Sequence, residues 1–82
     1  MAPSRFRGEK IGDKIGDRPL IIMVKAEAVK KLASLMSDAV LNGDYESIKV
    51  YVDAIEFQSN AILRIVREIR EIYNEQQEAQ EK

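Results

Sequence analysis

Cationic side chains are concentrated at the start of the chain. Mobile arginines and lysines are the usual contacts to nucleic-acid phosphates, and Phe6, between two arginines, could stack on a base. We therefore expect the arm to contact phosphates, with Lys25 extending the basic surface. The alternative is a solvated tail, because acidic residues are interspersed. The predicted nucleic-acid-binding residues are Arg5, Arg7, Lys10, Lys14, Arg18 and Lys25.

The carboxylates offer little catalytic or metal-binding chemistry. Neither Asp13 with Asp17 nor Asp44 with Glu46 has the spacing of a calcium loop or another metal motif. The chain has no His and no Cys, so the commonest general base and the thiolate nucleophile are both missing. We expect no metal, no cofactor and no enzymatic activity.

Length and charge set the class of protein. Eighty-two residues make one domain. The net charge is −1, and charged residues make up 33% of the chain, a composition that would suit a thermophile. The strongest apolar run, residues 20–24, is much shorter than a membrane helix requires. No signal-peptide pattern is visible, so the expected location is the cytoplasm.

Three segments differ in composition. Residues 1–18 are glycine-bearing and mildly basic, and predict a flexible arm. Residues 19–74 hold most of the apolar side chains and predict the folded domain. Residues 75–82 are acidic and polar, which predicts a frayed tail.

Helical spacing is clear in two places. Apolar residues recur every three or four positions within 25–41, and Asn42-Gly43 should end that helix, because glycine readily takes the left-handed conformation of a C-terminal cap. A second helix is expected from Ser59 onward. Residues 20–24 fit either a buried strand or the apolar start of a helix.

Residues 47–54 decide the fold class. Ile48, Val50, Val52 and Ala54 alternate with polar residues, which is the period of a half-buried strand and the reading we favour. The same region also fits a heptad stripe, so Asp44 could instead cap one long helix running to the C-terminus.

Read as strand or arm, helix, strand, helix, residues 15–73 resemble the Alba family of small nucleic-acid-binding proteins. Three stretches carry the likeness: Ile15-Gly16-Asp17-Arg18-Pro19-Leu20 through Val24, Asn42 through Ile48, and Ser59-Asn60-Ala61-Ile62 continuing to Arg67. The resemblance implies a dimer with a two-layer α/β fold that binds DNA or RNA, with Arg18 at the phosphate backbone. The family's basic loop is here the acidic and apolar Asp53–Phe57, and its C-terminal hairpin is missing.

The expected fold is thus a small, helix-rich, two-layer β-α-β-α domain that dimerises, and the expected function is nucleic-acid binding without strong sequence preference. The alternative is an all-α helical hairpin that forms a four-helix-bundle dimer and acts as a structural or adaptor protein. A ribbon-helix-helix regulator with residues 20–24 as its ribbon ranks third. Dimerisation is expected because one subunit cannot cover so many aliphatic side chains. The predicted interface comprises Ile55, Phe57, Ile62, Ile65, Val66, Ile69, Ile72 and Tyr73.

Overall fold

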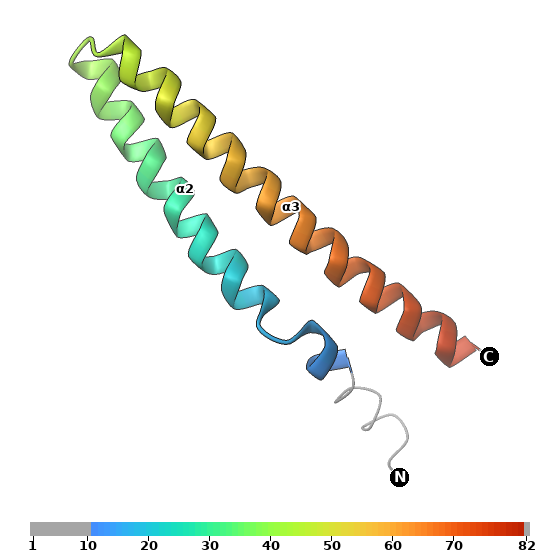
Figure 1. The fold of residues 1–82 in the computed structure, drawn as a ribbon. Helices are drawn as coiled ribbons and strands as arrows, with labels where there is room; N and C mark the ends of the chain where they lie inside the picture. The colour runs from blue at the N-terminus through green and yellow to red at the C-terminus, as the bar shows by residue number, and fades with distance from the viewer. Residues whose placement is uncertain (1–10, 82) are drawn as a thin grey trace.

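The computed structural model describes residues 11–81, with side-chain surroundings for residues 11–78. Helix α2 spans Arg18–Leu41 and helix α3 spans Tyr45–Glu81, and the two lie antiparallel beside each other (Figure 1). A helical turn at residues 11–15 precedes α2, separated from it by Gly16 and Asp17. The described residues contain no strand, so the predicted two-layer α/β fold is wrong and the helical hairpin is the observed architecture.

The strand predicted at residues 47–54 is the first part of α3. Ile48, Tyr51 and Ile55 are half-buried at helical spacing, whereas Val50 and Val52 are 63% and 46% exposed. The alternation of β-branched residues misled the sequence analysis, because β-branched side chains cost a helix only tenths of a kcal/mol each and packing along a long stripe overrides that preference. Residues 20–24 are likewise helical, which removes the ribbon of a ribbon-helix-helix protein.

The resemblance to the Alba family is also overturned. The stretch from Asn42 to Ile48 turns into a helix and not into a second strand, and Ser59 lies in the middle of α3 and not at a helix start. An Alba-like fold needs a sheet, and the described residues supply none. The short glycine-containing turns that carried the likeness are equally compatible with a connection between two helices.

A three-residue loop joins the helices, and its chemistry was visible in the sequence. Gly43 has a φ of +70°, its amide donates to the Val40 carbonyl at 3.2 Å, and the Asp44 amide donates to the Ala39 carbonyl at 2.9 Å. These two bonds form a Schellman motif, so the predicted stop at Asn42-Gly43 is confirmed. Asp44 then caps α3, accepting hydrogen bonds from the Ser47 amide at 3.3 Å and the Ser47 hydroxyl at 2.6 Å.

The two helices meet along a seam with alternating three- and four-residue spacing, the a and d positions of a heptad repeat. These side chains are half-buried except Ala39 and Gln76, which are buried. The seam comprises Arg18, Ile22, Lys25, Val29, Leu32, Met36 and Ala39 of α2, and Ile48, Tyr51, Ile55, Gln58, Ile62, Ile65, Ile69, Ile72 and Gln76 of α3.

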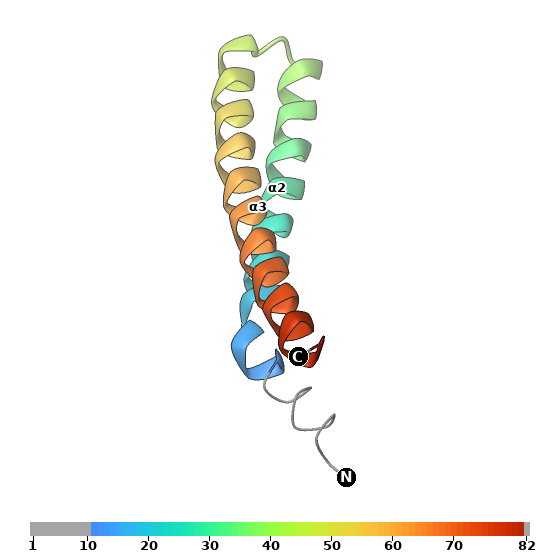
Figure 2. The same cartoon turned by 90° about the vertical axis from the view of Figure 1, so that its right-hand side faces the viewer.

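The molecule is long and narrow, and in the view of Figure 2 its two helices lie beside each other at the loop end and overlap toward the opposite end. Its Cα atoms extend over 62 × 18 × 13 Å, with a radius of gyration of 18.7 Å. A compact domain of this length would have a radius of gyration of about 12 Å. Ala39 is the one apolar residue among those described that is buried, and no described side chain is fully buried. The hairpin therefore has a seam but no closed hydrophobic core.

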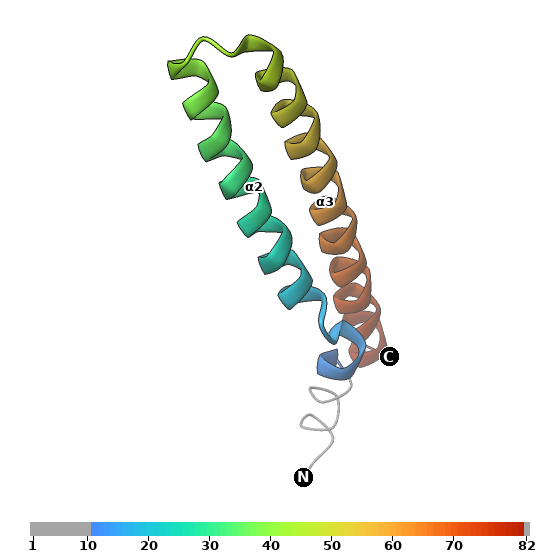
Figure 3. The same cartoon turned by 60° about the vertical axis from the view of Figure 1, so that its left-hand side comes forward.

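Parts of both predicted flanking segments are helical among the described residues. Residues 75–81, expected to form a frayed tail, extend α3 beyond the start of α2, as seen in Figure 3. Within the predicted arm, residues 11–15 form the helical turn, which ends at Gly16 with a φ of +56° and a hydrogen bond from the Gly16 amide to the Gly12 carbonyl at 2.8 Å. The remainder of that arm, residues 1–10, lies outside the described residues.

Candidate functional site

Three of the six predicted phosphate-binding residues, Arg5, Arg7 and Lys10, lie outside the described residues. The Arg18 side chain already has partners within the hairpin: its Nε donates to Glu68 Oε1 at 2.9 Å, and its Nη1 donates to the Lys14 carbonyl at 2.7 Å. Lys25 is half-buried in the seam, and Lys14 is exposed in the helical turn. The three predicted cations that the structure describes therefore have different surroundings: an ion pair for Arg18, the seam for Lys25 and solvent for Lys14.

The carboxylates singled out in the sequence have structural surroundings. Asp44 is the N-cap of α3, while Asp17 occupies the N-cap position of α2 without a capping hydrogen bond from its side chain. No group of three or more acidic, His or Cys side chains that could hold a metal ion occurs in the described part of the chain.

The predicted dimer-interface residues divide into two sets. Ile55, Ile62, Ile65, Ile69 and Ile72 lie in the seam, where they pack within the hairpin. The other three lie outside the seam: Val66 is half-buried, Phe57 is 70% exposed and Tyr73 is 51% exposed. Interface and seam were not distinguishable in the sequence, because one apolar stripe can serve either purpose.

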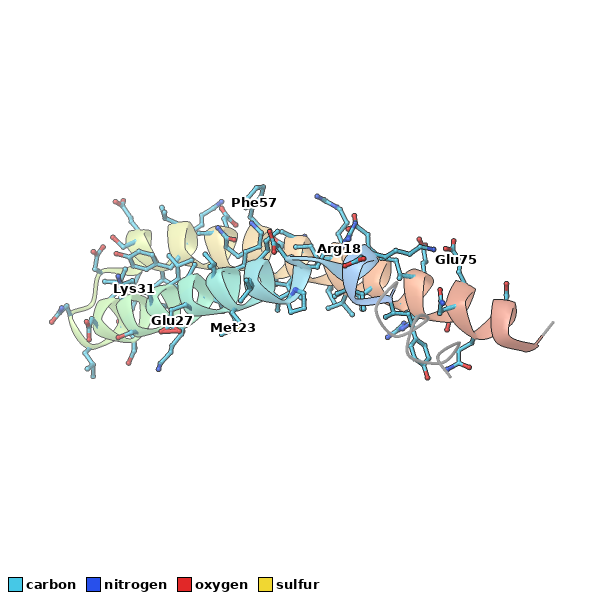
Figure 4. The ribbon with its side chains drawn as sticks, turned by 90° about the horizontal axis from the view of Figure 1, so that it is seen from below. Arg18, Met23, Glu27, Lys31, Phe57 and Glu75 are labelled. Carbon is cyan, nitrogen blue, oxygen red and sulfur yellow. The ribbon has the colours of Figure 1, made fainter. Side chains whose placement is uncertain are left out.

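Apolar side chains continue onto both broad faces of the hairpin. In an antiparallel pair, the g positions of both helices flank one side of the seam and the e positions flank the other. Figure 4 shows Phe57 and Met23 pointing to opposite sides. The first side, here called the Phe57 face, comprises the g and c positions. Its apolar residues are Ile21, Val24, Ala28 and Leu35 of α2 and Val50, Ala54, Phe57 and Ala61 of α3, and its charged residues include Lys31, Asp38, Arg64 and Glu68. The second, the Met23 face, comprises Met23, Ala26, Ala33 and Val40 of α2 and Val52, Leu63, Val66 and Tyr73 of α3.

The Phe57 face carries an exposed aromatic and a hollow. Phe57 is 70% and Val24 71% exposed. An open hollow of about 340 Å³ lies on α2 near its N-terminus, lined by Asp17, Leu20, Ile21, Val24 and Lys25. Ile21, Val24 and Leu35 were not predicted from the sequence to lie on an exposed face, although a second heptad stripe displaced from the seam would have revealed them.

Glutamines interrupt the apolar seam of α3. Gln58 lies in the seam with its Oε1 buried and without a hydrogen-bond partner among the described residues. Gln76 is 8% exposed near the end of the same seam. A buried amide oxygen that lacks a partner destabilises the pair it lies in, so Gln58 weakens the hairpin while restricting the ways in which its helices can align.

No helix among the described residues is both long enough and apolar enough to cross a membrane. Comparisons of the chain with protein-family models, with curated proteins and with solved structures find no match.

Proposed function

We propose that this protein is a non-enzymatic helical hairpin whose role is structural: it associates with a second copy of itself through an apolar face and closes a four-helix bundle. The observation that carries this proposal is the lack of a closed core. Large apolar side chains cover both faces of the hairpin, and Ala39 is the one described apolar residue that is buried.

A lone hairpin would leave many apolar side chains in contact with water. Thirteen large apolar side chains of the described residues are exposed, among them Val24 at 71% and Phe57 at 70%. Burying one such side chain contributes roughly 1.5–3 kcal/mol. Single exposed apolar residues are ordinary, but continuous apolar faces on a small protein mark association surfaces. Pairing of hairpins is a common way to bury such stripes.

Nucleic-acid binding has weaker support. The expectation of nucleic-acid binding was based partly on the resemblance to the Alba family, and the all-helical hairpin contradicts that resemblance. Arg18, the residue that the resemblance placed at the phosphate backbone, already forms an ion pair with Glu68. A structural protein that acts through self-association fits the exposed apolar faces better.

Sedimentation equilibrium tests the proposal. The full chain is expected to form dimers at micromolar concentration, and its helical circular dichroism should fall on dilution as the dimer dissociates, because an isolated pair of helices lacks a core. A monomer that keeps full helicity and unfolds cooperatively at all concentrations would contradict the proposal.

A further inference from the structure

We propose that the two copies stack through their Phe57 faces with both loops at the same end, so that α2 of each hairpin lies on α3 of the other and each Phe57 packs over Ala28 of the other copy. This inference rests on the proposed self-association and specifies its partner, face and register.

The ion pair between Arg18 and Glu68 fixes the heights of residues along the hairpin. In an antiparallel pair, two residues at the same height have numbers with a constant sum, and 18 and 68 set that sum near 86. A twofold axis along the hairpin brings α2 of one copy over α3 of the other at unchanged height. Val24 then faces Ala61, Ala28 faces Phe57, and Leu35 faces Val50.

Two of these three pairs place a larger side chain against alanine. Large-against-small matching lets two helices approach closely while the interface stays filled. The alternative twofold axis, across the hairpin, brings α2 onto α2 and α3 onto α3. If Ile21 and Leu35 of the two copies then pack together, the carboxylate of Glu68 comes opposite the apolar residues Ile48 and Val50. The proposed stack places Lys31 opposite Ala54, where the flexible aliphatic stem of the lysine can cover the alanine while its ammonium group stays in water.

Charge on the rim of the Phe57 face favours the same arrangement. Asp17 lines the hollow on α2, and Arg64 lies at a c position of α3 level with Ile22, about 7.5 Å along the axis from Asp17, a distance that an arginine side chain can span. Neither residue takes part in an ion pair within the described part of the chain. In the proposed stack, the aliphatic stem of Arg64 from the other copy covers the hollow beside Ile21, and its guanidinium reaches Asp17. The alternative axis instead brings Asp17 near Asp38, a repulsive pair.

The contact is large enough for a stable dimer. Helix α2 has 24 residues and the hairpin is 18 Å wide. At 1.5 Å per residue, one face covers about 650 Å², so two copies bury about 1300 Å². This value lies within the range of specific protein–protein interfaces. The Met23 face has a similar width, and both faces carry charged residues: Lys30, Glu56 and Arg70 on the Met23 face and Lys31, Arg64 and Glu68 on the Phe57 face. The hollow beside Ile21 and the 70% exposed Phe57 lie on the Phe57 face.

Disulfide cross-linking tests the register, and the chain has no native cysteine to interfere. Val24→Cys and Ala61→Cys are made separately, one with a size tag, then mixed and oxidised. The proposed stack predicts mixed dimers as the main product. The alternative axis places Val24 opposite Leu32 of the other copy and out of disulfide reach of both Val24 and Ala61, whereas Ala28 then meets Ala28. Absence of the mixed dimers together with self-cross-linking of Ala28→Cys would support the alternative axis and overturn the register. A control mixture of Ser34→Cys and Asn60→Cys, both on outward-facing f positions, should not cross-link.

Substitution tests the face. Phe57→Asp should raise the dimer dissociation constant about 100-fold or more, whereas Asn60→Asp adds the same charge on the outward side of α3 and should change it less than about threefold. Arg64→Asp should weaken the dimer. The double variant Arg64→Asp with Asp17→Arg exchanges the two charges and should restore dimerisation. Such a rescue would not occur if either residue had a merely structural role.

The outcomes separate this inference from the proposed function. If the wild-type chain dimerises but Phe57→Asp does not weaken it while Leu63→Asp does, the Met23 face is the interface and the inference fails, although self-association stands. If the wild-type chain is a monomer with full helicity, both fail. Dimerisation that is lost in Phe57→Asp and kept in Leu63→Asp, with mixed cross-links, supports both.

Discussion

The loop end and the open end of the hairpin are built differently. At the loop end, backbone hydrogen bonds of the Schellman motif at Gly43 and the capping carboxylate of Asp44 fix the connection between the helices. Ala39 is packed between the helices there and is only 6% exposed. At the open end, the partly exposed ion pair between Arg18 and Glu68 joins helices whose lengths do not match. The loop end is thus fixed by backbone hydrogen bonds and a helix cap, whereas the open end is held, among the described residues, by side-chain contacts alone.

The residues of the seam also differ between the two ends. Near the loop, seam residues such as Met36, Leu32 and Ile55 are apolar. Towards the open end, polar and charged residues enter the α2 seam at Lys25 and Arg18. The α3 seam stays apolar there, with Ile62, Ile65 and Ile69, so the difference between the two ends lies on the α2 side of the seam.

The largest expected effect is at the centre of the seam. Leu32→Asp places a carboxylate between the helices, which should destabilise the hairpin by about 3 kcal/mol or more. Circular dichroism should show loss of most helicity. Ser34→Asp adds the same charge to the outward side of α2 and should change the unfolding free energy by less than about 0.5 kcal/mol. Equal effects of the two substitutions would mean that the seam is not formed in solution.

The two ends can be compared directly with two glycine substitutions. Gly43 has a φ of +70° and nothing within 4 Å of an added Cβ, so Gly43→Ala should cost about 1 kcal/mol through backbone conformation alone. Gly12, in the helical turn at the open end, also has open space around it but does not have a positive φ, so Gly12→Ala should not destabilise the protein. Urea unfolding measures both values.

A third test replaces the unpartnered amide of the seam. Gln58→Leu removes a buried oxygen without a partner and adds apolar surface, so the free energy of unfolding should rise by about 1 kcal/mol. Gln77 is exposed and its Nε2 donates to the Tyr73 hydroxyl at 2.7 Å, so Gln77→Leu should give no gain. A lower unfolding temperature for Gln58→Leu would show that the amide finds a partner in the assembled protein.

The sequence predicted some elements and missed others for physical reasons. The helix over 25–41 and the stop at Asn42-Gly43 follow from local spacing and from glycine chemistry, and both are observed. Residues 47–54 satisfied both a strand period and a heptad period, and only their pairing with α2 selects the helix. The exposed faces could not be predicted for the same reason. Phe57 was assigned to an interface, but Ile21 and Val24 were not. Which residues are exposed depends on which apolar stripe of each helix packs in the seam between α2 and α3.

The smallest expected effect is at the ion pair of the open end. Arg18 and Glu68 are 34% and 47% exposed, so solvent screens their attraction and a double-mutant cycle with Arg18→Gln and Glu68→Gln should give a coupling of about 0.5 kcal/mol or less. The coupling should fall further when salt is raised from 0.05 to about 0.5 M, since screening shortens the range of surface electrostatics. A coupling above about 2 kcal/mol that resists salt would mean that the open end is as tightly closed as the loop end, because only a pair withdrawn from water by further packing reaches that value.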